Sequence, residues 1–421
     1  MALVPVHGGL SEPVQRILTL RERKQLLADA ERLPRIMVND ADLSAVYRLG
    51  DGTLSPLVGP MCEDEYNYVL DTHSILREGK RYAWAIPIAL PVTEEEAANL
   101  KEGSHAVVVN PAGEPVARLR VGGQPFAWDK ARYVRSVYLT DRMDHPGADI
   151  VTKDPRTLLV GGELWTLPQP RNPFFGQFML SPRQTRALIA DRNWDAAVAF
   201  QTRNPLHRAH EYALVAGVEE LTRKGLYAGV VLMPLVGQLK GDDVDARTRM
   251  RCYEVLLQHQ LLGHGDSDTA LWSNAGYDIS EVFELVALDI RMFYGGPSEA
   301  IMHSIYRQNH GFSHLVIGRK HADAPYFDGK PIWGDFDAQE IFDNLPGDLA
   351  IKPVKVGFAA YYDDLGRVDL MDNHPGVKPF FISGTKVREI LLSGQRPDPR
   401  IIRSEVADIL IAAYQERSNR Q

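Results

Sequence analysis

The stretch AAVAFQTRNPLHRAHEYALVAGVEEL, residues 196–221, joins a short apolar run to a longer segment with helical periodicity. The apolar run AAVAF predicts a buried strand. Leu214, Val218 and Leu221 recur at the spacing of one helix face, so the second half predicts a helix. Gly217 lies on the same segment, and such a small residue allows the helix to pack close to a sheet. A strand followed directly by a helix indicates a βαβ unit with a parallel sheet.

The same alternation continues downstream. We expect three further strands and two further helices, the second helix beginning at a proline and ending at a glycine. The strands are LYAGVVLMP (226–234), TALW (269–272) and HLVIG (314–318), and the helices are ARTRMRCYEVLLQHQLL (246–262) and PSEAIMHSIYRQNHG (297–311). The segment 171–340 is therefore expected to form an α/β domain with a parallel sheet, of the type that binds nucleotides.

Residues 1–170 have a different pattern. Short β-prone runs, YAWAIPIAL (82–90), HAVVVN (105–110) and PVARLRV (115–121), are separated by turn sequences and suggest an antiparallel barrel or sandwich. Three prolines and a glycine in 166–178 mark the boundary that follows.

Residues 341–421 are expected to form a small α/β C-terminal domain. The apolar run AIKPVKVGFAAY (350–361) predicts a strand, and TKVREILLSG (385–394) and SEVADILIAAYQER (404–417) predict helices. The chain as a whole is thus predicted to be a multidomain α/β protein.

Composition restricts the function. The 421 residues carry a formal net charge of −8, with 44% hydrophobic and 24% charged residues, which is typical of a globular protein and gives no general attraction for nucleic acid or an anionic membrane. Two cysteines, Cys62 and Cys252, exclude a disulfide framework and a cysteine-built zinc site. Without a long apolar run or a signal-like N-terminus, the expected location is the cytoplasm.

The junction QTRNPLHRAH (201–210) gathers hydrogen-bond donors where the strand ends and the helix begins. In an open parallel sheet, ligands bind outside the carboxyl ends of the strands, and a helix N-terminus favours a phosphate or sulfate. Arg203 can hold a tetrahedral oxyanion through two N–H bonds. His207 and His210 are three residues apart and, if both are helical, point to the same ligand, where they can become cationic beside a polyphosphate.

These residues also have two plainer interpretations. Two histidines can occur on a helix as capping or surface residues, and Arg208 between them can be a solvated side chain. A metal site is a second alternative, but it needs further ligands, and Glu211 does not stand where a zincin motif requires an acid.

A second cluster, VIGRKHADAP (316–325), again follows an apolar strand, and Gly318 there permits close approach of a ligand to the backbone. The stretch Ser383–Thr385 precedes a helix and is at least as well explained by an ordinary helix cap. Neither a Walker loop nor a GxGxxG after a strand occurs, which argues against a P-loop kinase or a nicotinamide dehydrogenase.

Together with LVPVHGGL, GTLSPLVGPM, DHPG, VGQLKGDD, GGPSEAIMHSIYRQNHG and FISGTKVREIL, the motif QTRNPLHRAHEY resembles the ATP sulfurylase (sulfate adenylyltransferase) family along nearly the whole chain. The resemblance implies a β-rich PUA-like N-terminal domain, a central Rossmann-like nucleotidylyltransferase domain and a small C-terminal domain. It also implies the reaction of ATP with sulfate to give adenosine 5′-phosphosulfate and pyrophosphate, with Mg²⁺ entering on ATP.

The resemblance further implies residue roles. Gln201, Arg203 and the backbone at Ala322 hold sulfate; Thr202, Arg203 and Asn204 form the active-site stretch, with Asn204 at the α-phosphate. His207 and His210 bind the β- and γ-phosphates. The implied ATP-binding set consists of Gln201, Arg203, Asn204, His207, His210, Gly318, Arg319, Lys320, His321 and Ala359. The resemblance implies a homo-oligomer. It implies no protein-bound metal, no structural zinc and no adenylyl-sulfate kinase domain.

The sequence departs from the family pattern. The family usually reads GRDHAG where this chain has GRKHAD, so Lys320 reverses a charge and Asp323 replaces a glycine; Ser298 stands where arginine is common. Two alternatives stay open: an adenylyltransferase that prefers another oxyanion, and a non-catalytic nucleotide- or RNA-binding relative, although the acidic charge argues against RNA. The direction of the reaction in the cell cannot be read from the residues.

Overall fold

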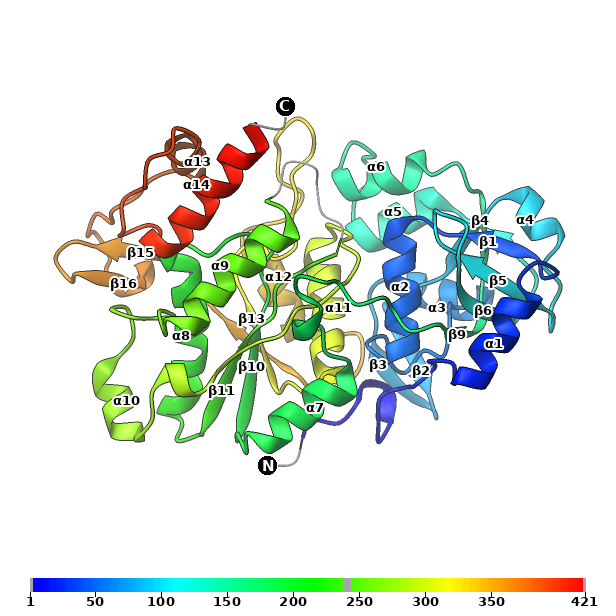
Figure 1. Ribbon diagram of the computed structural model, residues 1–421, viewed down its shortest axis with the longest axis horizontal. Helices are drawn as coiled ribbons and strands as arrows, with labels where there is room; N and C mark the ends of the chain where they lie inside the picture. Colours follow the sequence, from blue (N-terminus) through cyan, green and yellow to red (C-terminus); the bar gives the residue numbers. More distant parts are fainter. Residues whose placement is uncertain (1–2, 238–243, 419–421) are drawn as a thin grey trace.

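The computed structural model describes residues 3–237 and 244–418, which form two lobes side by side (Figure 1). The N-terminal lobe, blue to teal, carries the first six helices. The second lobe, green to red, contains the largest parallel sheet of the described residues and the C-terminal segment.

The sheet of the second lobe is parallel, with the strand order β12-β11-β10-β13-β14. Its strands are β10 (Ala196–Phe200), β11 (Ala228–Leu232), β12 (Phe283–Leu285), β13 (His314–Ile317) and β14 (Lys352–Lys355). The strands expected at β10, β11 and β13 are confirmed, and so is the parallel α/β architecture. Because β10 lies in the middle, the polar junction that follows it is at the centre of the sheet edge.

Helix α8 (Arg208–Arg223) follows β10 and packs on the sheet as its periodicity indicated. Leu214 and Val218 are completely buried. A Cβ added at Gly217 would lie 2.9 Å from Cγ2 of Val316 on β13, so only glycine allows this close approach of helix and sheet. The first turn of α8 is thereby fixed against the strand ends.

Three expectations for this lobe need correction. TALW is not a strand but part of helix α10 (Thr269–Ala275), because Asp268 caps the backbone N–H of Leu271 and Gly276 ends the helix with a left-handed backbone. Strand β12 was not anticipated. The sheet also continues beyond residue 340, where we expected the domain to end, since β14 pairs with β13.

The other helices of this lobe are α7 (Pro182–Asp191), α9 (Ala246–Gln258), α11 (Gly296–Asn309) and the short α12 (Asp337–Glu340). Among them, the two predicted near 246–262 and 297–311 are confirmed as α9 and α11, whereas α7 and α12 were not anticipated.

The N-terminal lobe has a four-stranded sheet in the order β1-β5-β6-β9, a three-stranded sheet β4-β8-β7 and the hairpin β2-β3. Its strands are β1 (Arg35–Met37), β2 (Ser74–Arg77), β3 (Lys80–Ala83), β4 (Leu90–Val92), β5 (His105–Val109), β6 (Pro115–Val121), β7 (Phe126–Ala127), β8 (Leu158–Val160) and β9 (Gly162–Thr166). The expected strands at β5 and β6 are present. The run 82–90 instead ends one strand and begins another, and its middle is buried loop.

Helices were underestimated in this lobe. It contains α1 (Leu20–Asp29), α2 (Asp40–Asp51), α3 (Glu63–Thr72), α4 (Glu94–Ala98), α5 (Lys130–Tyr138) and α6 (Pro146–Lys153). Several begin with a side-chain cap, for example Thr19 on the N–H of Glu22. The lobe is therefore a mixed α/β unit with a parallel β1–β5 pair, and not the purely antiparallel barrel or sandwich that the sequence suggested.

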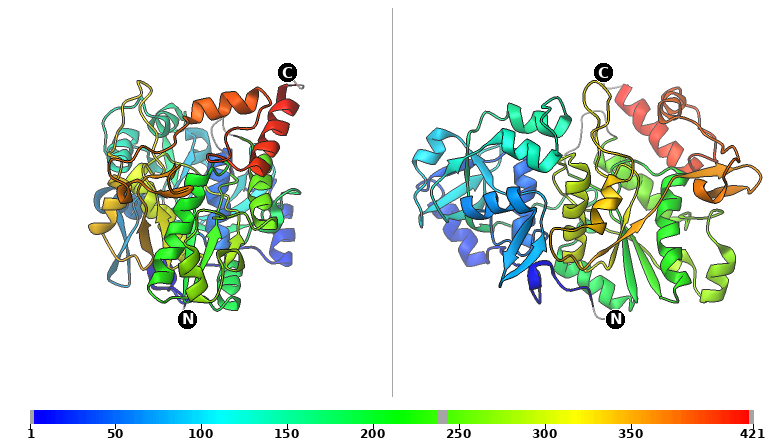
Figure 2. Two further views of the ribbon diagram at one scale, coloured as in Figure 1. Left: turned by 90° about the vertical axis from the view of Figure 1, so that its left-hand side faces the viewer. Right: turned by 180° about the vertical axis from the view of Figure 1, so that it is seen from behind.

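The C-terminal segment consists of the hairpin β15 (Ala359–Tyr362) and β16 (Arg367–Leu370), followed by α13 (Gly384–Leu392) and α14 (Ser404–Ser418). Figure 2 shows these elements against the α8 and α9 side of the second lobe. Val406 and Leu410 of α14 are buried in the same apolar cluster as Leu256 of α9. The hairpin is thereby held beside α8, near the end of β10.

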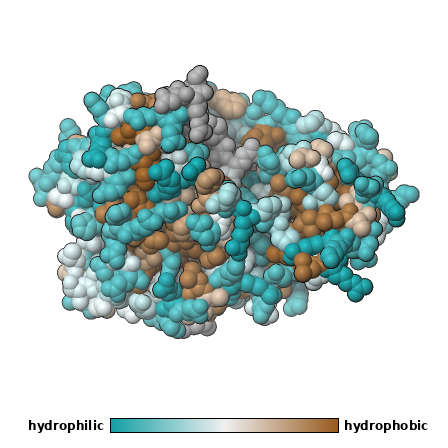
Figure 3. Space-filling model, in the orientation of Figure 1, coloured by the Kyte–Doolittle hydropathy of each residue, from teal (hydrophilic) through white to brown (hydrophobic). Residues whose placement is uncertain are grey.

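Helix α11 lies between the lobes, and all of its residues are buried (Figure 1). Asn309 at its end accepts a hydrogen bond from the N–H of His7 at 3.0 Å and donates to the carbonyl of Thr53 at 2.9 Å. In the described ranges, no helix is long and apolar enough to cross a membrane. Figure 3 shows hydrophobic residues on both lobes with hydrophilic residues interspersed.

Candidate active site

A cavity of about 480 Å³ lies at the carboxyl ends of β10 and β13 and reaches β15. This is where a parallel sheet binds its ligands. The cavity brings together every site residue expected from the sequence. They are Gln201, Thr202, Arg203, Asn204, His207, His210, Gly318, Arg319, Lys320, His321, Ala322 and Ala359.

The loop after β10 is held by its own backbone and by α9. The hydroxyl of Thr202 accepts from the N–H of Asn204 at 3.1 Å and donates to its carbonyl at 3.0 Å. Arg249 donates to the carbonyl of Arg203 at 3.0 Å, and Tyr253 donates to the carbonyl of Asn204 at 2.8 Å. Because the carbonyls are bound from behind, the loop can direct its side chains and N–H groups toward the cavity.

Two donor-bearing side chains of this loop retain unused capacity. Nη1 of Arg203 is buried and has no hydrogen-bond partner in the described structure, and its guanidinium lies 5.4 Å from the ring centre of Tyr294. Nε2 of Gln201 is bonded at 3.0 Å to Nδ1 of His303, while its Oε1 is buried without a partner. Buried polar atoms without partners are costly, so a ligand that satisfies them gains binding energy.

His207 and His210 stack face to face, with ring centres 3.7 Å apart and planes at 22°. His207 is the N-cap of α8 rather than a helical residue, and its Nδ1 accepts from the N–H of His210. Burial lowers the pKa of His210 to about 4, and burial and the neighbouring ring lower the pKa of His207. Both imidazoles are therefore neutral at pH 7 in this structure, and they become cationic only if a bound anion raises their pKa.

The loop after β13 contributes two cationic side chains. Arg319 and Lys320 both contact Asp335, at 3.1 and 3.4 Å, which moderates the added charge of Lys320. Lys320 and Ala322 have left-handed backbones, with φ of 51° and 54°. A Cβ at Gly318 would meet nothing within 4 Å, so this residue opens on free space.

Asp323 also lines the cavity, and its Oδ1 is buried without a hydrogen-bond partner in the part of the chain described. Burial raises the pKa of its carboxyl, and the charge of Lys320 opposes that rise. A carboxyl at this position repels an oxyanion when ionised and can donate a hydrogen bond to it when protonated.

Two other features do not belong to the cavity lining. Arg208 is not the solvated side chain that was considered: it is paired with the buried Asp266 through Nε at 2.8 Å and does not line the cavity. The plainer interpretation does hold for the stretch before α13. Ser383 caps α13 by accepting from the N–H of Lys386 at 3.2 Å, and Ser383, Gly384 and Thr385 do not line the cavity.

Sequence reasoning missed four residues that support the site: Arg249, Tyr253, Glu299 and His303. Arg249, Tyr253 and His303 act through contacts with residues distant in the chain, as in the bond from Arg249 to the Arg203 carbonyl, and Glu299 acts through His303 one helical turn away. No local motif marks them. Only the position of His303 in the buried interior of a predicted helix could have drawn attention to it.

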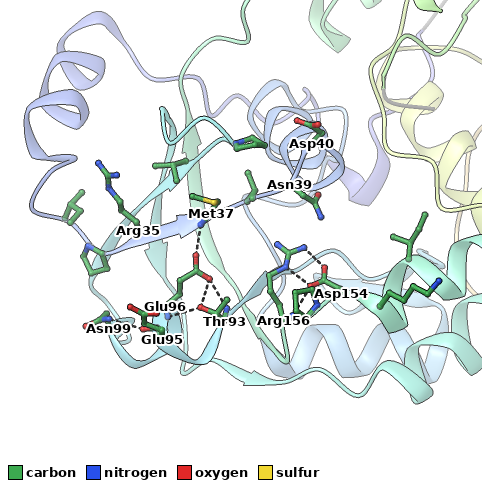
Figure 4. Close-up of a pocket in the computed structure, with 18 of the residues that line it drawn as sticks. Arg35, Met37, Asn39, Asp40, Thr93, Glu95, Glu96, Asn99, Asp154 and Arg156 are labelled. Carbon is green, nitrogen blue, oxygen red and sulfur yellow. Dashed lines mark hydrogen bonds and ion pairs between the residues drawn. The ribbon is translucent and has the colours of Figure 1, made fainter. Parts of the chain in front are cut away.

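A larger groove, of about 1210 Å³, lies in the N-terminal lobe (Figure 4). Several of its charged side chains pair with the protein itself. Glu96 accepts from the N–H groups of Met37 and Thr93, both at 2.8 Å. Arg156 donates to Asp154 through Nε at 2.9 Å. None of the described side chains that line this groove has a buried polar atom without a partner.

Among the residues that the structure describes, no group of three or more histidines, cysteines, aspartates or glutamates could hold a metal ion.

A parallel sheet whose central strand ends at a cavity lined by cationic and amide side chains is an arrangement that binds nucleotides. Residues 176–413 match the ATP-sulfurylase family, and residues 4–169 match the PUA-like domain. The chain belongs to the ATP-sulfurylase family.

Relatives agree along the whole length. The sulfate adenylyltransferase of Pyropia yezoensis is 51% identical over 413 residues, covering 97% of each chain. That of Nostoc punctiforme is 37% identical over 415 residues, covering 98% of this chain and 97% of the relative. A solved structure, titled hexameric APS kinase from Thiobacillus denitrificans, has a TM-score of 0.69 at 20% identity and covers 97% of this chain and 68% of that one, which shows a shared fold.

Proposed function

We propose that the protein is a sulfate adenylyltransferase, which joins sulfate to the α-phosphate of ATP and releases pyrophosphate. The observation that carries this proposal is the buried, unpartnered Nη1 of Arg203, which faces a cavity at the sheet edge together with His207 and His210. Nη1 is a donor, and Nδ1 of His210, also unpartnered, becomes a donor when an anion induces its protonation, so these groups suit two anions that must be held in contact. Family membership and the full-length relatives support the same reaction.

Sulfate binds to Arg203 and Gln201, with backbone help at Ala322. Arg203 is suited to this because a guanidinium offers parallel N–H bonds to a tetrahedral oxyanion. Its own carbonyl is fixed by Arg249, so the side chain starts from an anchored backbone. The unpartnered Nη1 is the atom expected to gain a bond when sulfate enters.

ATP binds as its magnesium complex. Asn204 orients the α-phosphate, His207 and His210 hold the β- and γ-phosphates, and Gly318–His321 and Ala359 line the nucleotide. Thr202 maintains the turn that presents these groups. Mg²⁺ would be held chiefly by the phosphate oxygens of ATP and would neutralise part of their charge.

The reaction is an in-line displacement at the α-phosphorus. Sulfate is already ionised, so the attack requires no general base, and catalysis comes from positioning and from stabilising charge on the departing pyrophosphate. Anionic phosphates raise the pKa of His207 and His210, which begin neutral, and convert them into cationic donors.

A second candidate is an adenylyltransferase of the same site with a preference for a different oxyanion. Asp323 supports it, because a carboxyl with an unpartnered buried oxygen lines the anion pocket. A comparison of sulfate, selenate, molybdate and phosphonates as substrates distinguishes the two: preference for an anion other than sulfate favours the second candidate.

We also propose that residues 1–170 form a supporting domain and that the chemistry belongs to the segment after 171, including β14 beyond residue 340. A homo-oligomeric assembly and a cytoplasmic location stay predictions.

The experiment that tests the function is ATP formation from adenosine 5′-phosphosulfate, pyrophosphate and Mg²⁺. The wild type should produce ATP, and His207→Ala should lose at least about 100-fold in kcat. His105→Ala, at an exposed position on β5, is the matched control and should stay within about twofold. A folded wild type that produces no ATP, or a fully active His207→Ala, would contradict the assignment.

A further inference from the structure

Helix α11 carries a column of buried polar residues behind the cavity. Glu299, His303 and Arg307 follow one another at intervals of four residues, so they lie along one face of the helix. All three are completely buried. None of them lines the cavity, yet a fully buried histidine beside a buried glutamate requires an explanation beyond packing.

One ring nitrogen of His303 joins the two loops of the site. Its Nδ1 lies 3.0 Å from Nε2 of Gln201, which follows β10, and 3.0 Å from Nε2 of His321, which follows β13. The loops follow neighbouring strands, and both line the same cavity. His303 is therefore a shared contact point for two residues expected to touch substrate.

The other ring nitrogen faces Glu299. Nε2 of His303 lies 3.3 Å from Oε1 of Glu299, within ion-pair distance but outside hydrogen-bond geometry, so the carboxylate favours a proton on this nitrogen through its charge. The two carboxylate oxygens accept backbone N–H groups from Phe293 at 2.9 Å and Gly295 at 3.0 Å. A carboxylate only accepts hydrogen bonds. The proton of His303 therefore belongs on Nε2, which leaves a lone pair on Nδ1.

This proton arrangement fixes the groups on the cavity side. An acceptor at Nδ1 requires that Gln201 present its NH₂ group there, which excludes the flipped amide and leaves its second N–H available for an anion. The same acceptor requires the Nε2–H form of His321. Burial and the nearby charge of Arg307 lower the pKa of His303, although Glu299 opposes this, so the neutral ring is favoured.

We propose that His303 is a positioning residue for the oxyanion pocket: with its proton held on Nε2 by Glu299, its Nδ1 orients the amide of Gln201 and selects the tautomer of His321. This proposal rests on the proposed function for the part that concerns sulfate. The tautomer itself can be tested without any activity.

Two substitutions separate the two ends of the ring. His303→Asn keeps an acceptor close to the position of Nδ1 and loses the contact with Glu299. His303→Gln reaches toward Glu299 and removes the acceptor at Nδ1. We expect His303→Gln to raise the KM for sulfate on the order of 10-fold and His303→Asn by less than about threefold, with the KM for MgATP within about twofold in both. An equal rise in both variants, or no rise in His303→Gln, would overturn the proposal.

A double-mutant cycle with Gln201→Ala tests the route. In that background, His303→Gln should change the KM for sulfate much less than it does in the wild type, because the amide it orients is gone. Fully additive effects would show that His303 does not act through Gln201.

The tautomer is measured by long-range ¹H–¹⁵N correlation spectra of the protein labelled with ¹⁵N-histidine, with the His303 signals assigned by their loss in His303→Asn. The neutral, Nε2-protonated form is the expected result. A proton on Nδ1, or a doubly protonated ring at pH 7, would overturn the proposal even if His303→Gln does not fold. If the wild type folds but produces no ATP, the proposed function fails while the spectrum still decides the tautomer.

Discussion

The groove of the N-terminal lobe has more than twice the volume of the cavity at the sheet edge, about 1210 against 480 Å³. Two charged side chains of this groove already have partners in the protein. Glu96 accepts from two backbone N–H groups, and Arg156 donates to Asp154. The smaller cavity contains buried atoms of Arg203 and His210 that have no partner in the described structure. The difference teaches that unsatisfied polar atoms, rather than volume, locate the chemistry, since burying them without a ligand costs free energy.

The largest expected difference concerns one arginine from each region. Arg203→Ala should lower kcat/KM for ATP formation by about 1000-fold, because it removes a charged donor that contacts the anion. Arg35→Ala, at an exposed position of the groove, should stay within about twofold. Steady-state kinetics measure both. Comparable losses in the two variants would remove the distinction between the regions.

The buried histidines provide a second test through stability. The pKa of His210 is about 4 in the folded protein, below its value of about 6.5 when unfolded, so the unfolded chain binds more protons in this interval. Stability that is present above pH 6.5 is therefore lost as the pH falls toward 4, by about 3 kcal/mol for this residue.

His210→Gln should remove that part of the pH dependence, which urea unfolding at pH 7 and pH 4.5 would measure. The exposed His259→Gln serves as the control and should keep the wild-type slope. An unchanged slope in His210→Gln would mean that the ring is not buried neutral.

Asp323 sharpens the comparison, because it is the acidic side chain placed among the donors. Burial raises the pKa of its carboxyl, so at high pH it is ionised and repels sulfate, and at lower pH it becomes neutral. In the wild type the KM for sulfate should fall by up to about fivefold as the pH is lowered from 7 toward the raised pKa of this carboxyl. It should change less in Asp323→Asn. Parallel pH profiles of the two proteins would exclude a role for this carboxyl.

The smallest expected effect comes from the support behind the loop. Tyr253→Phe removes the hydrogen bond to the Asn204 carbonyl and should cost about 1 kcal/mol in unfolding free energy. It should also lower kcat/KM by about threefold, as the loop loosens. Thermal unfolding and the ATP assay measure these changes. A variant identical to the wild type in both would show that the loop conformation does not depend on the Tyr253 hydrogen bond.

Sequence alone predicted the parts that depend on local pattern. The strand β10, helix α8 and the polar junction between them follow from apolar periodicity, and the strands β11 and β13 from apolar runs. The resemblance then supplied residues distant in the chain, such as Gly318 and Ala359, which line the same cavity.

What could not be predicted depends on long-range contacts or on short ambiguous runs. TALW is too short for its period to distinguish strand from helix, and the capping Asp268 decides it. The role of His303 exists only because Gln201 and His321 come within 3.0 Å of it. Likewise, the neutral state of His210 follows from burial, which no motif reveals.

The measurement that tests the central claim most directly is a crystal structure of the protein with adenosine 5′-phosphosulfate bound. The account predicts the ligand in the cavity at the ends of β10 and β13, with its sulfate against Gln201 and Arg203 and its adenosine toward Gly318 and Ala359. Ligand in the groove beside Arg35, with the cavity empty, would contradict it.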